Sequence, residues 1–174
     1  EGLVPPLRDV ATDAQTPSED ELVSMIFLLF GAGQETTTHL ISGGLLALLS
    51  HEDQRRQLTS NPGQMAACVE ECLRWVSPVQ MTKPRFATRD MVWQGRQFRR
   101  GDMLAGFLAA ANVDPAEFEH PHRFDISRDP NPHLSFGTGS HFCLGFQLAR
   151  AETAIAFERI LARYPNMRLV TDGR

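Results

Sequence analysis

Residues 136–145 read FGTGSHFCLG, and this stretch decides more about the fold and chemistry of the chain than any other. It places Cys143 where a glycine-rich loop meets a helix expected over residues 143–163. Free backbone N–H groups and the helix dipole at such a junction favour a thiolate over a thiol, and a thiolate is a metal ligand or a nucleophile. A small apolar side chain packed at a helix start is the other interpretation of a lone cysteine.

Two further hypotheses for this loop each lack a residue. A nucleophilic cysteine needs a histidine base that approaches from elsewhere in the fold, and His141 is only two positions away. A cysteine hydrolase would also need a third partner, which the sequence does not supply. Gly137 and Gly139 begin a nucleotide-binding pattern, but Phe142 stands where the third glycine belongs.

Outward from the loop, the chain is predicted to be mostly helical with a small sheet, an α+β fold. Ser18 with Glu21 three residues later is a capping box, and the apolar run after it predicts a helix that continues to about residue 50. Gly31, Gly33 and the threonines at 36–38 are poor helix formers at its centre and typical causes of a kink. The other elements are expected as helices at 51–58 and 61–77, strands and turns at 82–108, a long loop at 109–141 and a strand at 167–170.

Two of these helices carry an apolar stripe at helical spacing. In the helix at 61–77 the stripe consists of Met65, Val69, Cys72 and Val76. In the helix at 143–163 it consists of Leu144, Leu148, Ala151 and Ile155. Each stripe is predicted to face the core.

Composition places the chain among ordinary globular proteins. Its 174 residues are 42% hydrophobic and 22% charged, and 17 basic against 21 acidic side chains give a net charge of −4, which argues against nucleic-acid binding. Three cysteines are too few for a disulfide framework and indicate a reducing compartment. The apolar run at 25–33 is too short to cross a bilayer and no leader opens the chain, so we expect a cytoplasmic protein without membrane contact.

Both ends of the sequence suggest a piece of a longer protein. The first residue is Glu1 rather than Met, and residues 171–174 read as a turn after a strand. Residues 1–17 contain three prolines and are expected to form a loop that leads into the first helix.

With its flanks, the cysteine loop resembles the haem-binding loop of the cytochrome P450 superfamily, Phe-x-x-Gly-x-x-x-Cys-x-Gly. Phe136, Gly139, Cys143 and Gly145 match it position for position. The resemblance implies that Cys143 is the axial ligand of haem b, whose iron it makes competent for O–O cleavage. It also implies that the loop glycines, Gly137 among them, let the backbone approach the sulfur.

The centre of the first helix carries a second mark of this superfamily. Residues 32–37 read AGQETT and resemble the pattern of the long helix on the distal side of the haem. The resemblance implies that Ala32 and Gly33 line a groove for dioxygen and that Glu35 and Thr36 relay protons. The alternative is that Thr36 bonds back within its helix while Glu35 is merely exposed.

Glu71 and Arg74 fit the superfamily's Glu-x-x-Arg pattern. Periodicity alone places them opposite the apolar stripe and predicts a solvated pair. The resemblance implies instead a buried structural network that a third arginine completes. Arg123, in the meander-like segment 121–124, is the first choice for that arginine and Arg128 is the reserve.

The resemblance also implies cations for the two haem propionates. It assigns this role to Arg85, His133 and His141. The remaining histidines are interpreted as capping or surface residues: His39, His51, His120 and His122. Cys68 and Cys72 lie at helical spacing, and core packing is the better interpretation than a metal site because no second pair exists.

Taken together, the resemblance spans about residues 18–170 and is nearest to the soluble bacterial branch. It implies that residues 18–174 are part of a haem-binding monooxygenase domain whose N-terminal half is absent. The expected activity inserts one atom of O2 into a small organic substrate, with electrons ultimately from NAD(P)H through a ferredoxin and a ferredoxin reductase docked over the Cys143 face. The alternative is a truncated, non-catalytic fragment that keeps the haem-binding motifs without a closed pocket.

Overall fold

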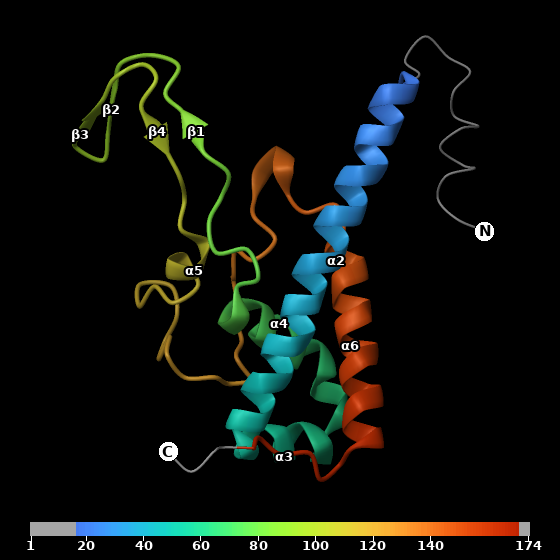
Figure 1. Ribbon diagram of the computed structural model, residues 1–174. Coiled ribbons are helices and arrows are strands. Elements are labelled where there is room, and N and C mark those ends of the chain that lie inside the picture. Colours follow the sequence, from blue (N-terminus) through green and yellow to red (C-terminus); the bar gives the residue numbers. More distant parts are fainter. Residues whose placement is uncertain (1–16, 171–174) are drawn as a thin grey trace. The chain divides into compact units, whose positions relative to one another are not determined.

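The computed structural model describes residues 17–170 (Figure 1). Its internal contacts divide the chain into two units, Glu1–Glu35 and Thr36–Arg174. The helix α2 (Glu19–Ser50) contributes its first half to one unit and its second half to the other. The loop predicted at 1–17 and the turn predicted at 171–174 fall outside the described residues, except for Pro17. No helix within residues 17–170 is both long and apolar enough to span a bilayer.

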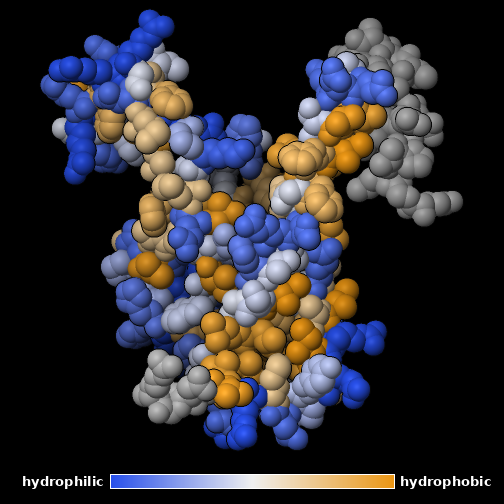
Figure 2. Space-filling model, in the orientation of Figure 1, coloured by the Kyte–Doolittle hydropathy of each residue, from blue (hydrophilic) through white to orange (hydrophobic). Residues whose placement is uncertain are grey.

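The first unit contains the start of α2, and its cap forms as predicted. The backbone N–H and the hydroxyl of Ser18 donate to Glu21 Oε2 at 2.7 and 3.0 Å, while the Glu21 N–H donates to Ser18 Oγ at 3.2 Å. The hydrogen bond from the Ser18 backbone lowers the pKa of Glu21. The helix then continues without interruption through the glycines and threonines at 31–38. Large apolar side chains, such as Phe27 and Phe30, lie exposed along this half of α2, where Figure 2 is orange.

In the second unit, three helices meet around one close contact. The second half of α2 packs with α4 (Met65–Val76) and α6 (Phe146–Arg163), which lie side by side (Figure 1). A Cβ atom at Gly44 would lie 2.7 Å from Phe157 Cζ and 3.1 Å from Cys72 Sγ. Only glycine therefore lets the three helices approach this closely. The core around the contact includes Leu40, Leu48, Leu58, Val69, Cys68, Cys72, Leu73, Phe124, Ile126 and Phe157.

The helices differ from the sequence prediction mainly at their starts. α3 covers Glu52–Ser60, and a 3-10 turn, η1 (Pro62–Gln64), precedes α4. α6 begins at Phe146, so Cys143 belongs to the loop before the helix and not to its first turn. The helix at the C-terminal end of the core is thus shorter than predicted by three residues at its start.

The stripe predicted to be the buried face of α6 is wrong. Leu144, Leu148 and Ile155 are exposed, whereas Thr153 and Phe157 are buried. Periodicity detects an apolar face, but it does not say which face the neighbouring helix covers. The strand predicted at 167–170 is also absent from that segment, which instead is held by a hydrogen bond from Arg55 Nη1 to the Met167 carbonyl at 2.7 Å.

The small sheet expected at 82–108 is present as two antiparallel pairs. β1 (Arg85–Phe86) pairs with β4 (Met103–Leu104), and β2 (Met91–Trp93) pairs with β3 (Arg96–Phe98). The β2–β3 turn has positive φ at Gln94 (51°) and Gly95 (74°), which is the pattern of a two-residue type I′ hairpin. The mostly helical fold with a small sheet is therefore confirmed.

The long loop predicted at 109–141 contains only short helical pieces. The single-turn helix α5 covers Leu108–Ala111, and η2 covers Gly139–His141. Between them the chain runs through turns and bends. Because this segment lacks regular structure of its own, the hydrogen bonds that fix it to α4 decide where the cysteine loop lies.

Candidate functional site

The cysteine loop is closed by its own backbone. The Cys143 N–H donates to the Phe136 carbonyl at 3.0 Å, and the Phe142 N–H donates to the Gly139 carbonyl at 3.0 Å. Gly137 and Gly139 have φ of 71° and 75°, in the left-handed region that side chains other than glycine rarely adopt. The two glycines thus permit a tight turn that presents Cys143 at its end.

The thiol of Cys143 is half-buried and free, and one side of its loop is open. An added Cβ at Gly137, Gly139 or Gly145 would meet no atom within 4 Å. Cys68 and Cys72, by contrast, are fully buried in the core, as predicted. A hydrogen bond from Cys68, together with burial, raises the pKa of Cys72 well above its ordinary value. Cys143 is therefore the accessible thiol of the chain.

A buried polar cluster ties the loop to the C-terminal end of α4. Ser135 Oγ donates to the Leu73 carbonyl at 2.7 Å, and Asn112 Nδ2 donates to Ser135 Oγ at 3.0 Å and to Ser77 Oγ at 2.8 Å. The Leu134 N–H donates to Asn112 Oδ1 at 2.7 Å. Asn112 is fully buried and uses both ends of its amide, so it fixes the approach of the chain to the cysteine loop.

A second anchor joins α4 and α6 to the same loop through Glu70. Arg150 donates to both Glu70 oxygens, from Nε at 2.6 Å and from Nη2 at 2.7 Å, and His133 Nε2 lies 3.1 Å from Glu70 Oε2. The guanidinium of Arg150 also lies 4.7 Å from the centre of the Phe136 ring. Burial alone would raise the pKa of Glu70, but the hydrogen bonds from Arg150 and His133 outweigh it and lower the pKa to about 2. The bond to Glu70 in turn raises the pKa of Arg150.

This anchor gives His133 a partner that the sequence did not predict. Its side chain is only 4% exposed, Nε2 faces Glu70, and Nδ1 accepts the Ser135 N–H at 3.3 Å. Both ring nitrogens therefore have partners within the described part of the protein. His133 lies beside the loop, as the motif implies, and its role toward a propionate stays a prediction.

The pair formed by Glu71 and Arg74 is fully buried, contrary to what periodicity predicts and as the resemblance implies. Arg74 donates to Glu71 from Nε at 2.8 Å and from Nη2 at 2.7 Å. Its remaining donors reach the carbonyls of Asn112, Pro121 and Arg123 at 2.8–3.1 Å. The pair lies buried because the segment after α5 folds across this face of α4.

Arg128, and not Arg123, is the arginine that completes this network. Arg128 Nε donates to Glu71 Oε2 at 3.2 Å with a side chain only 10% exposed. The side chain of Arg123 is 64% exposed and lies 3.9 Å from Asp125, while only its carbonyl accepts from Arg74 and Arg128. The first choice made from the sequence is thus wrong and the reserve is right.

The other predicted site residues are either exposed at the surface or part of α2. Arg85 in β1 and His141 in η2 are exposed, and neither side chain bonds to any residue in the part of the chain that the structure describes. Ala32, Gly33 and Glu35 lie on α2 in the first unit, and Thr36 lies on the same helix in the second. Within residues 17–170 no group of three or more metal-binding side chains gathers elsewhere.

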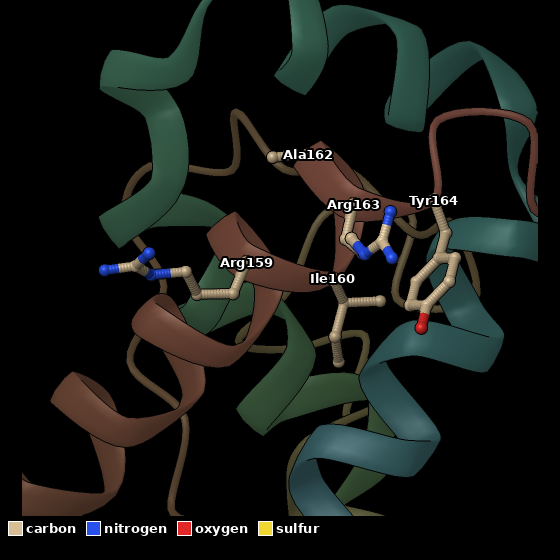
Figure 3. Close-up of a pocket in the computed structure, with 5 residues that line it drawn as sticks. All are labelled: Arg159, Ile160, Ala162, Arg163 and Tyr164. Atoms are coloured by element: carbon tan, nitrogen blue, oxygen red, sulfur yellow. The ribbon is translucent and has the colours of Figure 1, made fainter.

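Two surface hollows lie at the end of α6 that is far from the cysteine loop. One, of about 580 Å³, is lined by Arg159, Ile160, Ala162, Arg163 and Tyr164 (Figure 3). The other, of about 540 Å³, follows it along residues 164–167. Since α6 has 18 residues and rises about 1.5 Å per residue, these hollows are roughly 25 Å from the cysteine loop. Neither is lined by a cysteine, a histidine or a carboxylate, so the cysteine loop remains the candidate site.

Comparison with known proteins assigns the family. The model of the family Cytochrome P450 matches residues 63–166, which contain the Glu71 network and the cysteine loop. A glycine-rich cysteine loop in a mostly helical fold therefore lies inside the matched region. The chain belongs to the cytochrome P450 family.

Individual relatives agree with this assignment. The chain is 48% identical over 156 residues to cytochrome P450 CYP107DY1 of Priestia megaterium, with 90% of this chain and 38% of the relative covered. It is 42% identical over 170 residues to a steroid C26-monooxygenase of Mycobacterium tuberculosis, with 98% and 45% covered. The chain therefore spans less than half of the length of these relatives.

Solved structures give the same result. The myxobacterial cytochrome P450 CYP267B1 in complex with myristic acid superposes with a TM-score of 0.93 at 45% identity, with 98% of this chain and 42% of that chain covered. The Bacillus subtilis cytochrome P450 PksS superposes with a TM-score of 0.87 at 40% identity, with 97% and 47% covered.

Sequence reasoning missed several residues that support the site. They are Glu70, Asn112, Ser135 and Arg150. Glu70 and Arg150 are 80 residues apart, and nothing in either local sequence indicates the other. The one available signal was Glu70 itself, a second acid directly before the Glu-x-x-Arg pattern.

Proposed function

We propose that this chain is the haem-binding part of a monooxygenase that inserts one oxygen atom of O2 into a small organic substrate. The second oxygen atom leaves as water after two electrons and two protons are taken up. The electrons come ultimately from NAD(P)H and reach the site through a ferredoxin and a ferredoxin reductase. The observation that carries the proposal is a free, half-buried Cys143 at the end of a glycine loop whose neighbouring side is open.

The residues of the loop fit haem b. A single thiolate suits iron as a soft, strongly donating ligand. The open side of the loop leaves room for a flat ring beside Cys143, because Gly137, Gly139 and Gly145 carry no side chain and face empty space. Arg85 and His141 are exposed cations or potential cations free to meet the propionates, whereas His133 is already held by Glu70.

When bound, the haem would supply the redox chemistry that activates dioxygen. The residues of the chain would do the rest. Cys143 would bind the iron, and Arg85 and His141 would neutralise the propionates. Glu35 and Thr36 would hold and move protons, a role that rests on the AGQETT motif at 32–37. The Glu71–Arg74–Arg128 network would hold the fold beneath the loop and take no part in the chemistry.

Two observations favour the alternative of a non-catalytic fragment. The chain covers only 38–45% of the relatives described above, and large apolar side chains on α2 and around α6, such as Phe27, Leu144 and Leu148, are exposed. A fragment with uncovered apolar surface could keep the cysteine loop and still lack a closed pocket for a substrate.

A labelling experiment separates the two. The chain is loaded with haemin and supplied with a ferredoxin, its reductase, NADPH and ¹⁸O2, and a panel of small organic compounds is examined by mass spectrometry. A monooxygenase yields products heavier by one ¹⁸O atom, and Cys143→Ser abolishes them, while the loop control Ser140→Ala keeps them. Haem uptake without labelled product supports the non-catalytic alternative.

A further inference from the structure

We propose that Glu70, Arg150 and His133 act as a clamp that positions the cysteine loop, and with it the sulfur of Cys143. Glu70 lies on α4, Arg150 lies on α6, and His133 lies at the start of the loop segment. The inference deepens the proposed function, because it concerns the residue proposed to bind the iron. Their contacts are to one another and to the cysteine loop, so they act as positioning residues.

Glu70 is the centre of the clamp because it receives every polar bond in it. Its two oxygens accept a forked pair of hydrogen bonds from Arg150 at 2.6 and 2.7 Å and lie within 3.1 Å of His133 Nε2. A forked arginine–carboxylate pair fixes direction as well as distance. The side chains of Arg150 and Glu70 are only 31% and 29% exposed, so the pair is partly shielded from water.

Arg150 passes this fixed geometry to the loop through an aromatic ring. Its guanidinium lies 4.7 Å from the centre of the Phe136 ring and 5.4 Å from the centre of the Phe146 ring. Phe136 is in turn the residue whose carbonyl accepts the Cys143 N–H at 3.0 Å. A shift of Arg150 therefore moves Phe136, and the Phe136 carbonyl is hydrogen-bonded to the Cys143 N–H.

His133 contacts the segment that leads into the same loop. Its Nδ1 accepts the Ser135 N–H, which means that Nε2 carries the proton and donates it to Glu70. The backbone at Ser135 is thus connected through His133 to Glu70 on α4. The neighbouring Glu71 binds Arg74, Arg128 and Asn131 instead, so the two adjacent acids of α4 serve different segments.

Alkylation of Cys143 measures the position of the loop without any haem. The full chain is treated with iodoacetamide at one pH, and the modified cysteine is identified by mass spectrometry; Cys68 and Cys72 are fully buried and do not compete. Glu70→Gln and Arg150→Gln are each expected to speed alkylation by about fivefold or more, because loss of the charged pair frees the loop. The matched controls Glu119→Gln and Arg123→Gln, at exposed side chains, are expected to react at the original rate.

The signs of the two effects separate positioning from simple electrostatics. Removing a negative charge at Glu70 favours the thiolate and speeds alkylation, whereas removing a positive charge at Arg150 slows it. A clamp predicts faster alkylation in both variants, so opposite signs would overturn the proposal, as would rates equal to those of the controls. Circular dichroism identifies variants that unfold. Arg150→Lys then gives the deciding alkylation rate, because it keeps the charge but loses the forked hydrogen bonds and the flat stacking surface. A rate faster than that of the original chain supports the clamp, and an unchanged rate refutes it.

A spectrum of the haem-loaded chain provides a second readout. With haem bound, Arg150→Gln is expected to shift all or part of the Soret band of the reduced carbon monoxide complex. Arg150→Lys is expected to restore part of the original band. If the original chain takes up no haem, the proposed function fails at that step. The alkylation rates would still decide the clamp, so the two failures are distinguishable.

Discussion

Replacement of Arg128 by glutamine tests which arginine completes the buried network. Arg128 is 10% exposed and donates to Glu71 Oε2 at 3.2 Å, and Glu71 is fully buried. A hydrogen bond to a charged group contributes about 1.5–3 kcal/mol. The forked bonds from Arg74 stay in place, so Glu71 is not left without a cation and the larger cost of an unpaired buried charge does not arise. We expect Arg128→Gln to lower the free energy of unfolding by about 2 kcal/mol.

The matched control is Arg123→Gln. The Arg123 side chain is 64% exposed and 3.9 Å from Asp125, and its contribution to the network is a backbone carbonyl that the substitution keeps. We expect a change within about 0.5 kcal/mol.

Urea unfolding followed by circular dichroism gives the comparison. For a domain of this size the free energy of unfolding falls by about 2 kcal/mol per molar urea, so Arg128→Gln should move the midpoint by about 1 M. A double-mutant cycle with Glu71→Gln should give a coupling energy of about 1 kcal/mol or more. A larger loss for Arg123→Gln than for Arg128→Gln, or a coupling energy near zero, would refute the assignment.

Two further predictions concern acid stability and helix packing. The pKa of Glu70 is lowered from 4.5 to about 2, so its stabilising effect is complete above about pH 4.5 and is lost as the pH falls toward 2. The free energy of unfolding of the original chain should therefore decrease by up to about 3 kcal/mol more between pH 5 and pH 2 than that of Glu70→Gln, and parallel pH profiles would contradict this. Gly44→Ala should destabilise the chain by about 1–3 kcal/mol in thermal unfolding, since its Cβ would lie 2.7 Å from Phe157. Gly33→Ala is the control, because its Cβ meets no atom within 4 Å, and it should leave stability equal or up to about 1 kcal/mol higher.

The features that could be predicted from the sequence are those fixed by neighbouring residues. Ser18 and Glu21 cap α2 because the bonds that they exchange span only three positions. The tight turn at Gly137 and Gly139 likewise follows from residues within one loop. The mostly helical fold and the family resemblance rest on such local patterns, and both are confirmed.

The features that could not be predicted depend on which distant segment covers a surface. Periodicity places Glu71 and Arg74 on the polar side of α4, and the pair is buried only because residues 112–131 fold over that side. The choice between Arg123 and Arg128 depends on how that segment turns, which no spacing in the sequence records. The contact between His133 and Glu70 could not be predicted because the two residues are 63 positions apart.

The apolar stripe on α6 shows the same limit for apolar residues that are exposed. Leu148 and Ile155 follow helical spacing, yet α4 packs against the face that contains Phe157. The sequence reveals an apolar face, but only the tertiary arrangement shows whether the described part of the chain buries it.

The most direct test of the central claim, that Cys143 binds haem iron through its sulfur, is the difference spectrum of the reduced chain with and without carbon monoxide. The chain is mixed with haemin, reduced, and compared with Cys143→Ser and with the loop control Ser140→Ala. We predict a strongly red-shifted Soret band in the original chain and in Ser140→Ala, and its loss in Cys143→Ser. A band typical of histidine ligation, or a red-shifted band that survives in Cys143→Ser, would contradict the assignment of Cys143 as the ligand.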